Sequence, residues 1–79
     1  MLVSLANLKV GERAQVVKLE QAQPGYRQRL LAMGVIPGAK LQVIRKAPLG
    51  DPIELKIDTF SVSVRKKESQ IVILEKLEP

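Results

Sequence analysis

Few side chains in this 79-residue chain are of types that take part in catalysis, and the composition therefore argues against an enzyme. There is no Cys and no His, so the commonest nucleophile and the commonest general base are both missing. No phosphate-binding pattern of the G-x-x-x-x-G-K or G-x-G-x-x-G type occurs. The serines have no imidazole to activate them, and their spacing does not suggest a Ser–Lys pair; they are Ser4, Ser61, Ser63 and Ser69. We therefore expect a protein that is not an enzyme and that works by binding.

Metal and cofactor chemistry is also weakly supported. Without Cys and His, the usual ligands of zinc and iron–sulfur clusters are missing. A hard cation needs several converging oxygens, and the eight carboxylates are scattered along the chain. Met33 is a soft ligand, but it falls on the apolar face of a predicted helix. We predict no cofactor, and direct carriage of iron remains a minor alternative.

The loop at residues 47–52, APLGDP, is the first candidate for a binding surface. Pro48 and Pro52 restrict themselves and the residues before them to extended conformations, and Gly50 permits a sharp reversal. A stiff loop of this kind loses little entropy when it binds. Leu49 is expected at the tip, where it either contacts a partner or folds back onto the protein.

Basic residues flank this loop. If the strands at Lys40–Lys46, Ile53–Ile57 and Phe60–Val64 form a meander, the first and third run parallel and their carboxyl ends meet. That end would carry a basic surface around an apolar tip, although Arg65, Lys66 and Lys67 also fit a solvated turn. Arg29 is either a solvated helix residue or a contact or pairing residue. The candidate partner-binding residues are Leu49, Asp51, Arg45, Lys46, Arg65, Lys66 and Arg29.

The first half of the chain predicts one strand and one helix. Residues 4–8 suit a short helical turn that Ser4 caps, with Leu5 and Leu8 on one face. A strand is predicted at Arg13–Leu19. Tyr26, Leu30 and Met33 have helical spacing, and Gly34 is expected to end that helix with a positive φ. Pro37-Gly38 fits the centre of a type II turn.

The second half predicts four strands. Alternation marks Ile53–Ile57 and Phe60–Val64, joined by a tight turn at Asp58-Thr59, after the strand at Lys40–Lys46. Residues 66–70 are polar and suggest a turn, and residues 71–74 suggest a short fifth strand. Five strands, with one short helix inserted after the first, predict a mainly β fold that forms a small, partly open barrel in a single domain spanning residues 1–79. An open α+β sheet is the alternative.

Composition limits the core and the setting of the protein. Hydrophobic residues make up 46% of the chain but aromatic residues only 3%, so Val, Ile, Leu and Ala must build the core. The N-terminal MLVSLANLKV lacks the pattern of a signal peptide, and no apolar run is long enough to span a membrane. We therefore expect a cytoplasmic protein. The net charge of +5 fits an acidic partner, a nucleic acid or a membrane surface.

Taken in order, these segments resemble the FeoA family, small cytosolic partners of bacterial ferrous-iron transport. The resemblance runs from Leu5, Leu8 and Gly11 through Arg29-Leu30, Met33-Gly34 and Pro37-Gly38. It is most specific at residues 47–52 and the later Val64-Arg65. It implies an SH3-like barrel and a partner, the membrane iron transporter FeoB with its GTP-binding region. The family often has Gly in the hairpin where this chain has Asp58-Thr59.

The leading hypothesis is thus a regulatory module that binds FeoB and is recruited by it to the inner face of the membrane. The alternative is a small basic barrel that binds nucleic acid, which the charge supports. Tyr26 and Phe60 are the only aromatic residues and are expected in the core, where they cannot stack on bases. We therefore expect no nucleic-acid partner. Exposed strand edges also allow weak self-association.

Overall fold

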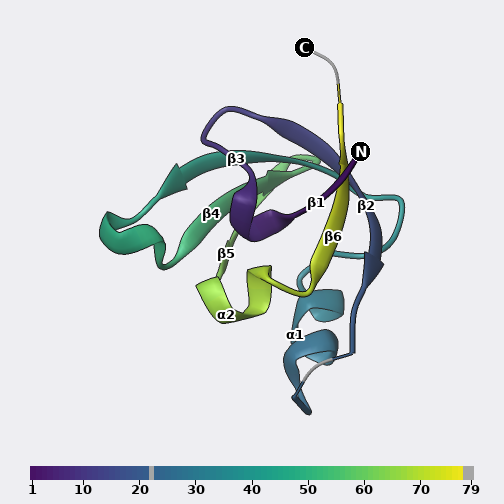
Figure 1. Cartoon of the computed structure of the whole chain (residues 1–79). Helices are drawn as coiled ribbons and strands as arrows, with labels where there is room; N and C mark the ends of the chain where they lie inside the picture. The colour runs from purple at the N-terminus through teal and green to yellow at the C-terminus, as the bar shows by residue number, and fades with distance from the viewer. Residues whose placement is uncertain (22, 78–79) are drawn as a thin grey trace.

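The computed structural model describes residues 1–21 and 23–77 of the chain, and within them the fold is mainly β (Figure 1). The elements, in chain order, are β1 (Leu2–Ser4), the 3-10 helix η1 (Leu5–Asn7), β2 (Arg13–Leu19), α1 (Tyr26–Ala32), β3 (Lys40–Lys46), the 3-10 turn η2 (Pro48–Gly50), β4 (Ile53–Ile57), β5 (Phe60–Val64), α2 (Lys66–Ser69) and β6 (Val72–Lys76).

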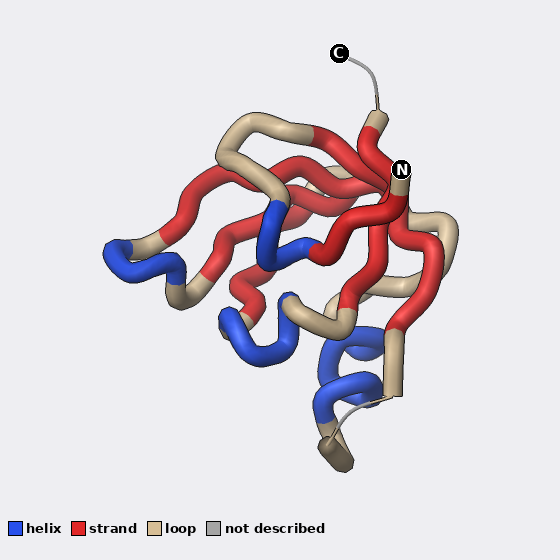
Figure 2. The backbone as a smooth tube through the Cα atoms, viewed as in Figure 1, coloured by secondary structure: helices blue, strands red, loops and turns tan. Residues whose placement is uncertain are grey.

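The described strands form one antiparallel sheet in the order β1-β6-β2-β3-β4-β5. The sheet curls strongly without closing, and α1 and α2 both lie at its lower end in the view of Figures 1 and 2. This arrangement confirms the predicted mainly β, small barrel-like fold with an inserted helix. It also confirms the meander, because β3, β4 and β5 are neighbours in sequence order.

The predicted number of strands was wrong, because β1 was missed. β1 has only three residues and runs directly into η1, so it carries no alternating pattern of its own. Its partner is β6 at the other end of the chain, where Leu2 pairs with Glu75. The backbone hydrogen bonds of β1 are made with β6, which is distant in sequence, so the local sequence around β1 does not reveal the strand. As a result, α1 follows the second strand and not the first.

Two β-bulges help to curl the sheet. The register of β2 against β6 shifts between Val16 and Lys18, and that of β3 against β4 shifts between Val43 and Arg45. A bulge bends its strand and increases the local twist. Each bulge also breaks the inward-outward alternation: Val17 and Lys18 are both exposed in β2, and Ile44 and Arg45 are both exposed in β3.

The core contains no aromatic residue among its fully buried members. Its buried residues are aliphatic: Leu5, Leu8, Ala14, Val16, Leu19, Leu30, Val35, Leu41, Val43, Ile53, Leu55, Ile57, Val64, Ile71, Val72 and Leu74. Tyr26 is only partly buried, and Phe60 is 46% exposed. The expectation that both would be core residues was therefore wrong for Phe60, whereas Tyr26 packs against the core from its edge. Phe60 opens β5 directly after the hairpin turn, and its ring covers Gly34 from outside.

The turns at the end of α1 follow the prediction. Gly34 has φ 94°, and Gly38 has φ 92° after Pro37, with Ala39 N–H donating to the Ile36 carbonyl at 3.0 Å. The hydrogen bond between Ala39 and Ile36 closes the predicted type II turn around Pro37-Gly38. The hairpin turn between β4 and β5 also forms, and Asp58 takes a positive φ of 57° there.

Three local predictions need correction. Ser4 stands before η1, but its side chain makes no capping hydrogen bond; Ser4 is the last residue of β1 and pairs with Ile73 of β6. Residues 66–70 are not a simple turn, since α2 forms at Lys66–Ser69. The last strand starts at Val72 and extends to Lys76, beyond the apolar run, because β2 continues to pair with it there.

Candidate functional site

The β3–β4 connection, residues 47–52, is here called the tip loop. Ala47 and Asp51, the residues before the two prolines, are extended as predicted, with φ/ψ of −64°/163° and −143°/118°. The loop closes on itself, because Ala47 N–H donates to the Pro52 carbonyl at 3.0 Å and Gly50 N–H donates to the Ala47 carbonyl at 2.7 Å. Prolines and internal hydrogen bonds together make this loop stiff.

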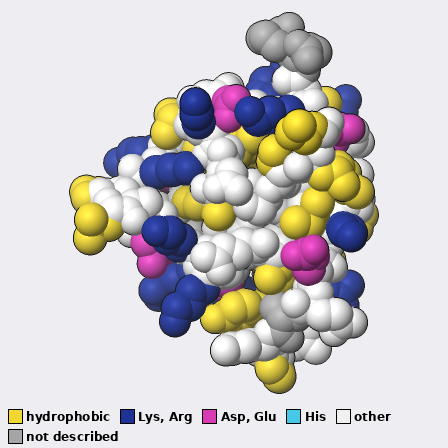
Figure 3. All heavy atoms as spheres, viewed as in Figure 1, with side chains coloured by type: hydrophobic (Ala, Val, Ile, Leu, Met, Phe, Trp, Pro, Cys, Tyr) yellow, Lys and Arg dark blue, Asp and Glu magenta, His cyan; other side chains and the backbone are white. Residues whose placement is uncertain are grey.

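Leu49 stands at the end of the tip loop. Its side chain is 94% exposed, so the expectation that it folds back onto the protein is excluded. Its backbone is left-handed, with φ 71° and ψ 8°, a conformation that costs a non-glycine residue about 1–2 kcal/mol. In Figure 3 hydrophobic side chains protrude at the left edge, over η2, with Lys and Arg side chains on the surface beside them. The loop thus holds an apolar side chain away from the protein at an energetic cost.

The strand register places the predicted basic residues around this tip. Lys46 pairs with Ile53, and Ile53 pairs with Val64, so the carboxyl ends of β3 and β5 lie at the same end of the sheet. On the β3 side, the Arg45 Nε lies 3.9 Å from a Glu54 carboxylate oxygen, and the Lys46 Nζ donates to the Ala6 carbonyl at 3.4 Å. Arg45 and Lys46 therefore flank the tip loop as predicted.

Asp51 and Lys66 connect the tip loop to α2. The backbone N–H of Lys66 donates to the Asp51 Oδ1 at 3.1 Å, which gives the first residue of α2 an acceptor. Asp51 was predicted to contact a partner, and in the structure one of its oxygens has this internal role. The contact fixes the loop against the end of β5.

Arg29 belongs to an ion pair whose acidic partner, Glu68, was not predicted from the sequence. Its Nε lies 3.4 Å from the Glu68 Oε2, while the Glu68 Oε1 accepts the Arg65 N–H at 3.1 Å. Glu68 is only 3% exposed, whereas the Arg29 side chain is 55% exposed. Glu68 thus joins α1 to α2, and Arg29 is a pairing residue. The available signal was the position of Glu68, three residues after Arg65, where an acidic side chain caps a helix N-terminus.

Two cavities share Arg29 and Arg65 in their linings, and we call them together the arginine cleft. The first has a volume of about 360 Å³ and is lined by Arg29, Asp51, Pro52, Ser63 and Arg65. The second has a volume of about 250 Å³ and is lined by Tyr26, Arg29, Arg65, Lys67 and Glu68. Three predicted residues, Arg29, Asp51 and Arg65, thus meet in one place. Tyr26, Ser63, Lys67 and Glu68 were not among the predicted site residues.

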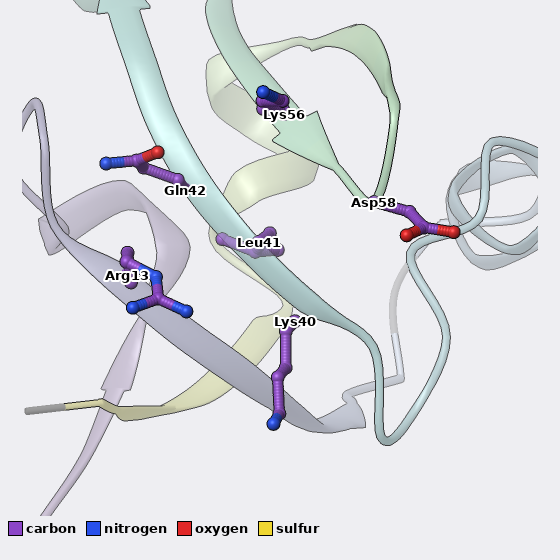
Figure 4. Close-up of a pocket in the computed structure, with 6 residues that line it drawn as sticks. All are labelled: Arg13, Lys40, Leu41, Gln42, Lys56 and Asp58. Atoms are coloured by element: carbon purple, nitrogen blue, oxygen red, sulfur yellow. The ribbon is translucent and has the colours of Figure 1, made fainter.

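A separate basic hollow of about 250 Å³ lies on the outer face of β2, β3 and β4 (Figure 4). Arg13, Lys40 and Lys56 line it, together with Asp58 from the hairpin turn. The charged side chains labelled in Figure 4 point in different directions and do not converge on a common point, and the labelled Leu41 is buried. This hollow offers positive charge without a defined set of ligands.

Within residues 1–21 and 23–77, no three side chains of the His, Cys, Asp and Glu types come together as a metal site would require. In the same residues, no helix is both long enough and apolar enough to cross a membrane.

Comparison with known proteins agrees with this picture. A curated relative, the Fe(2+) transport protein A/Fe(2+) transporter FeoB fusion protein of Porphyromonas gingivalis (strain ATCC BAA-308 / W83), is 32% identical over 71 residues. The alignment covers 90% of this chain but only 8% of that much longer protein.

Among solved structures, FeoA of Chlorobium tepidum is 39% identical, with a TM-score of 0.85 over 96% of this chain and 71% of that one. The zinc complex of Stenotrophomonas maltophilia FeoA, described as an SH3 domain protein, matches in fold at 21% identity, with a TM-score of 0.78 over 92% and 89% of the two chains. The FeoA domain family matches residues 3–76. The SH3-like fold expected from the resemblance is therefore confirmed, and the chain belongs to the FeoA family.

Proposed function

We propose that this protein is a non-enzymatic accessory protein of ferrous-iron uptake, and that it binds the cytosolic GTP-binding region of the transporter FeoB. The Porphyromonas gingivalis relative supports this, because there a related sequence and FeoB belong to one fusion protein. A covalent link holds two parts at a high effective concentration, as suits parts that act together. For this protein we place the same association in the cytoplasm, at the inner face of the membrane.

The exposure of Leu49 on the tip loop is the observation on which the proposed contact surface depends. Leu49 is an almost fully exposed leucine on a stiff loop, held in a backbone conformation that leucine disfavours. Burial of a leucine side chain in a partner contributes about 1.5–3 kcal/mol. Because the tip loop is already ordered, little of that energy is lost to ordering on binding.

The basic residues around the tip give the contact its charge. Arg45 and Lys46 lie on one side of the tip loop, and Arg65 and Lys66 lie on the other. An acidic patch on the partner would be attracted to this end of the protein. Exposed charges of this kind mainly raise the association rate and orient the encounter, and salt screens them.

The test is a binding titration against the cytosolic GTP-binding region of FeoB from the same organism, at low and high salt and in each nucleotide state. We expect saturable binding that weakens as salt rises. Leu49→Asp should weaken binding strongly and leave the thermal midpoint nearly unchanged, since the side chain is exposed. A large loss of stability would instead make Leu49 part of the fold.

The matched control is Ile36→Asp. Ile36 is also an exposed aliphatic residue, but it precedes β3 and so lies at the other end of the meander from the tip loop. Equal weakening by both variants would move the contact away from the tip. Binding to arbitrary oligonucleotides with a steep salt dependence, and no binding to FeoB, would favour the nucleic-acid alternative.

A further inference from the structure

We propose that the arginine cleft is a carboxylate-binding site, which holds an Asp or Glu side chain of an acidic protein segment between Arg29 and Arg65. This inference rests on the proposed function, because it specifies the chemistry of the partner that the same end of the protein would contact. The cleft lies beside the tip loop, since Asp51 and Pro52 line it and Leu49 is two residues away.

The charges of the cleft leave it with a positive excess. Arg29, Arg65 and Lys67 face Glu68 in one cavity, and Arg29 and Arg65 face Asp51 in the other. Both acidic side chains already accept internal hydrogen bonds. In the part of the chain that the structure describes, the Arg65 guanidinium has no acidic partner, so it is available to an anion from outside.

Glu68 prepares Arg29 for this role. The buried carboxylate contacts the Nε of Arg29, and its other oxygen is fixed by the Arg65 N–H. A guanidinium group has five N–H donors in a rigid fork, so the terminal nitrogens of Arg29 keep donors for a second acceptor. A donor that is held in place before binding loses less conformational freedom when the ligand arrives.

The same acidic side chains decide which anion fits. A carboxylate carries one charge spread over a planar group, which matches the guanidinium fork. A phosphate carries more charge, and it would meet the Asp51 and Glu68 carboxylates that line the two cavities. A protein segment is favoured as the source because the neighbouring exposed Leu49 would contact apolar side chains of the same partner.

The site itself is tested without FeoB, by NMR of the arginine Nε–H groups in the intact chain. The probes are N-acetyl-glutamate methylamide, its glutamine counterpart and inorganic phosphate. We expect the glutamate probe to shift the signals of Arg29 and Arg65 and to leave Arg27 unchanged, because Arg27 lies two residues from Arg29 on α1 and faces another direction. Equal shifts at Arg27, or larger shifts with phosphate, would overturn the proposal.

The second arm measures affinity for the FeoB region. Arg65→Gln keeps the backbone N–H that Glu68 needs, and it should weaken binding about tenfold. Arg27→Gln removes the same charge outside the cleft and should weaken binding less than about twofold. Arg65→Lys should restore only part of the affinity, because Lys lacks the planar fork.

The two proposals fail in different ways. If the wild-type protein binds FeoB but Arg65→Gln and Arg27→Gln behave alike, the carboxylate site is wrong and the proposed function stands. If the glutamate probe shifts Arg29 and Arg65 but FeoB does not bind in any nucleotide state, the site stands and the proposed partner is wrong.

Discussion

Replacing Leu49 by glycine should stabilise the protein while it weakens partner binding. The left-handed backbone of Leu49, with φ 71°, is unfavourable for a side chain with a Cβ atom and is readily adopted by glycine. The leucine side chain is almost fully exposed, so its removal costs the folded state little packing. The two effects of the substitution, on the fold and on the contact, therefore have opposite signs.

The expected gain in stability follows from two opposing terms. Relief of the left-handed conformation contributes about 1–2 kcal/mol. The extra freedom of glycine in the unfolded chain costs about 0.4–1 kcal/mol. The net gain lies between about 0 and 1.6 kcal/mol, and its central value of about 0.8 kcal/mol would raise the thermal midpoint of a domain of this size by about 3–6 °C.

The assay is urea unfolding and thermal unfolding of both proteins, beside a titration with the FeoB region. Asp58→Gly is the matched control, because Asp58 also has a positive φ, 57°, but lies in the hairpin turn at the other end of β4. Aspartate tolerates this conformation better than leucine, so its gain in stability should be smaller. Its affinity for the partner should not change.

Loss of stability on Leu49→Gly would refute the argument, because it would mean that the side chain is packed or that its backbone is unstrained. Unchanged affinity, together with the expected gain in stability, would mean that Leu49 is not the anchor of the contact. A strained and exposed residue would then lack a binding role.

Three further predictions concern the fold. Gly34→Ala and Gly38→Ala place a Cβ at nearly the same φ, 94° and 92°, and each should lower the free energy of unfolding in urea by about 1–2 kcal/mol. Of these two Cβ atoms, only the one at Gly34 meets a neighbour, Phe60 Cζ at 3.2 Å, so Gly34→Ala should cost up to about 1 kcal/mol more. Equal costs would show that the Phe60 ring moves aside freely. Glu68→Ala should lower the free energy of unfolding by about 1–3 kcal/mol, because it leaves the Arg65 N–H and the Arg29 guanidinium without their acceptor. Glu68→Gln should lower it less, and the reverse order of the two variants would contradict the roles given to the Glu68 carboxylate. The pKa of Glu12 is lowered by the hydrogen bond from the Lys9 N–H and, next, by the hydrogen bond from the Lys76 side chain. The contribution of Glu12 to stability is therefore present above its pKa in the unfolded chain and is lost as pH falls through its folded-state pKa. The difference in urea midpoint between wild type and Glu12→Gln should shrink over that acidic range, and a difference that does not change with pH would contradict the lowered pKa.

The tip loop was predictable because its determinants are local. Two prolines set the conformations of Ala47 and Asp51, and a glycine permits the reversal, all within six residues. The position of the basic residues needed one more step, the meander of β3, β4 and β5. That step succeeded because the short connections between these strands leave neighbouring strands adjacent in the sheet. The exposure of Leu49 did not follow from the sequence, which allowed both positions for its side chain.

The arginine cleft was only partly predictable, because its key residue is defined by a contact between distant segments. Glu68 lies in a charged run that reads as a solvated turn, yet it is buried and paired with Arg29 of α1, from which β3, β4 and β5 separate it along the chain. A buried carboxylate is costly unless it is paired and hydrogen-bonded, so the pairing with Arg29 and the Arg65 N–H is what permits its position. The same pairing fixes one guanidinium beside a second one that has no acidic partner among the described residues. The ion pair between α1 and α2 therefore assembles the cleft, and substitutions that disturb Glu68 should alter partner binding and stability together, whereas substitutions of Leu49 separate them.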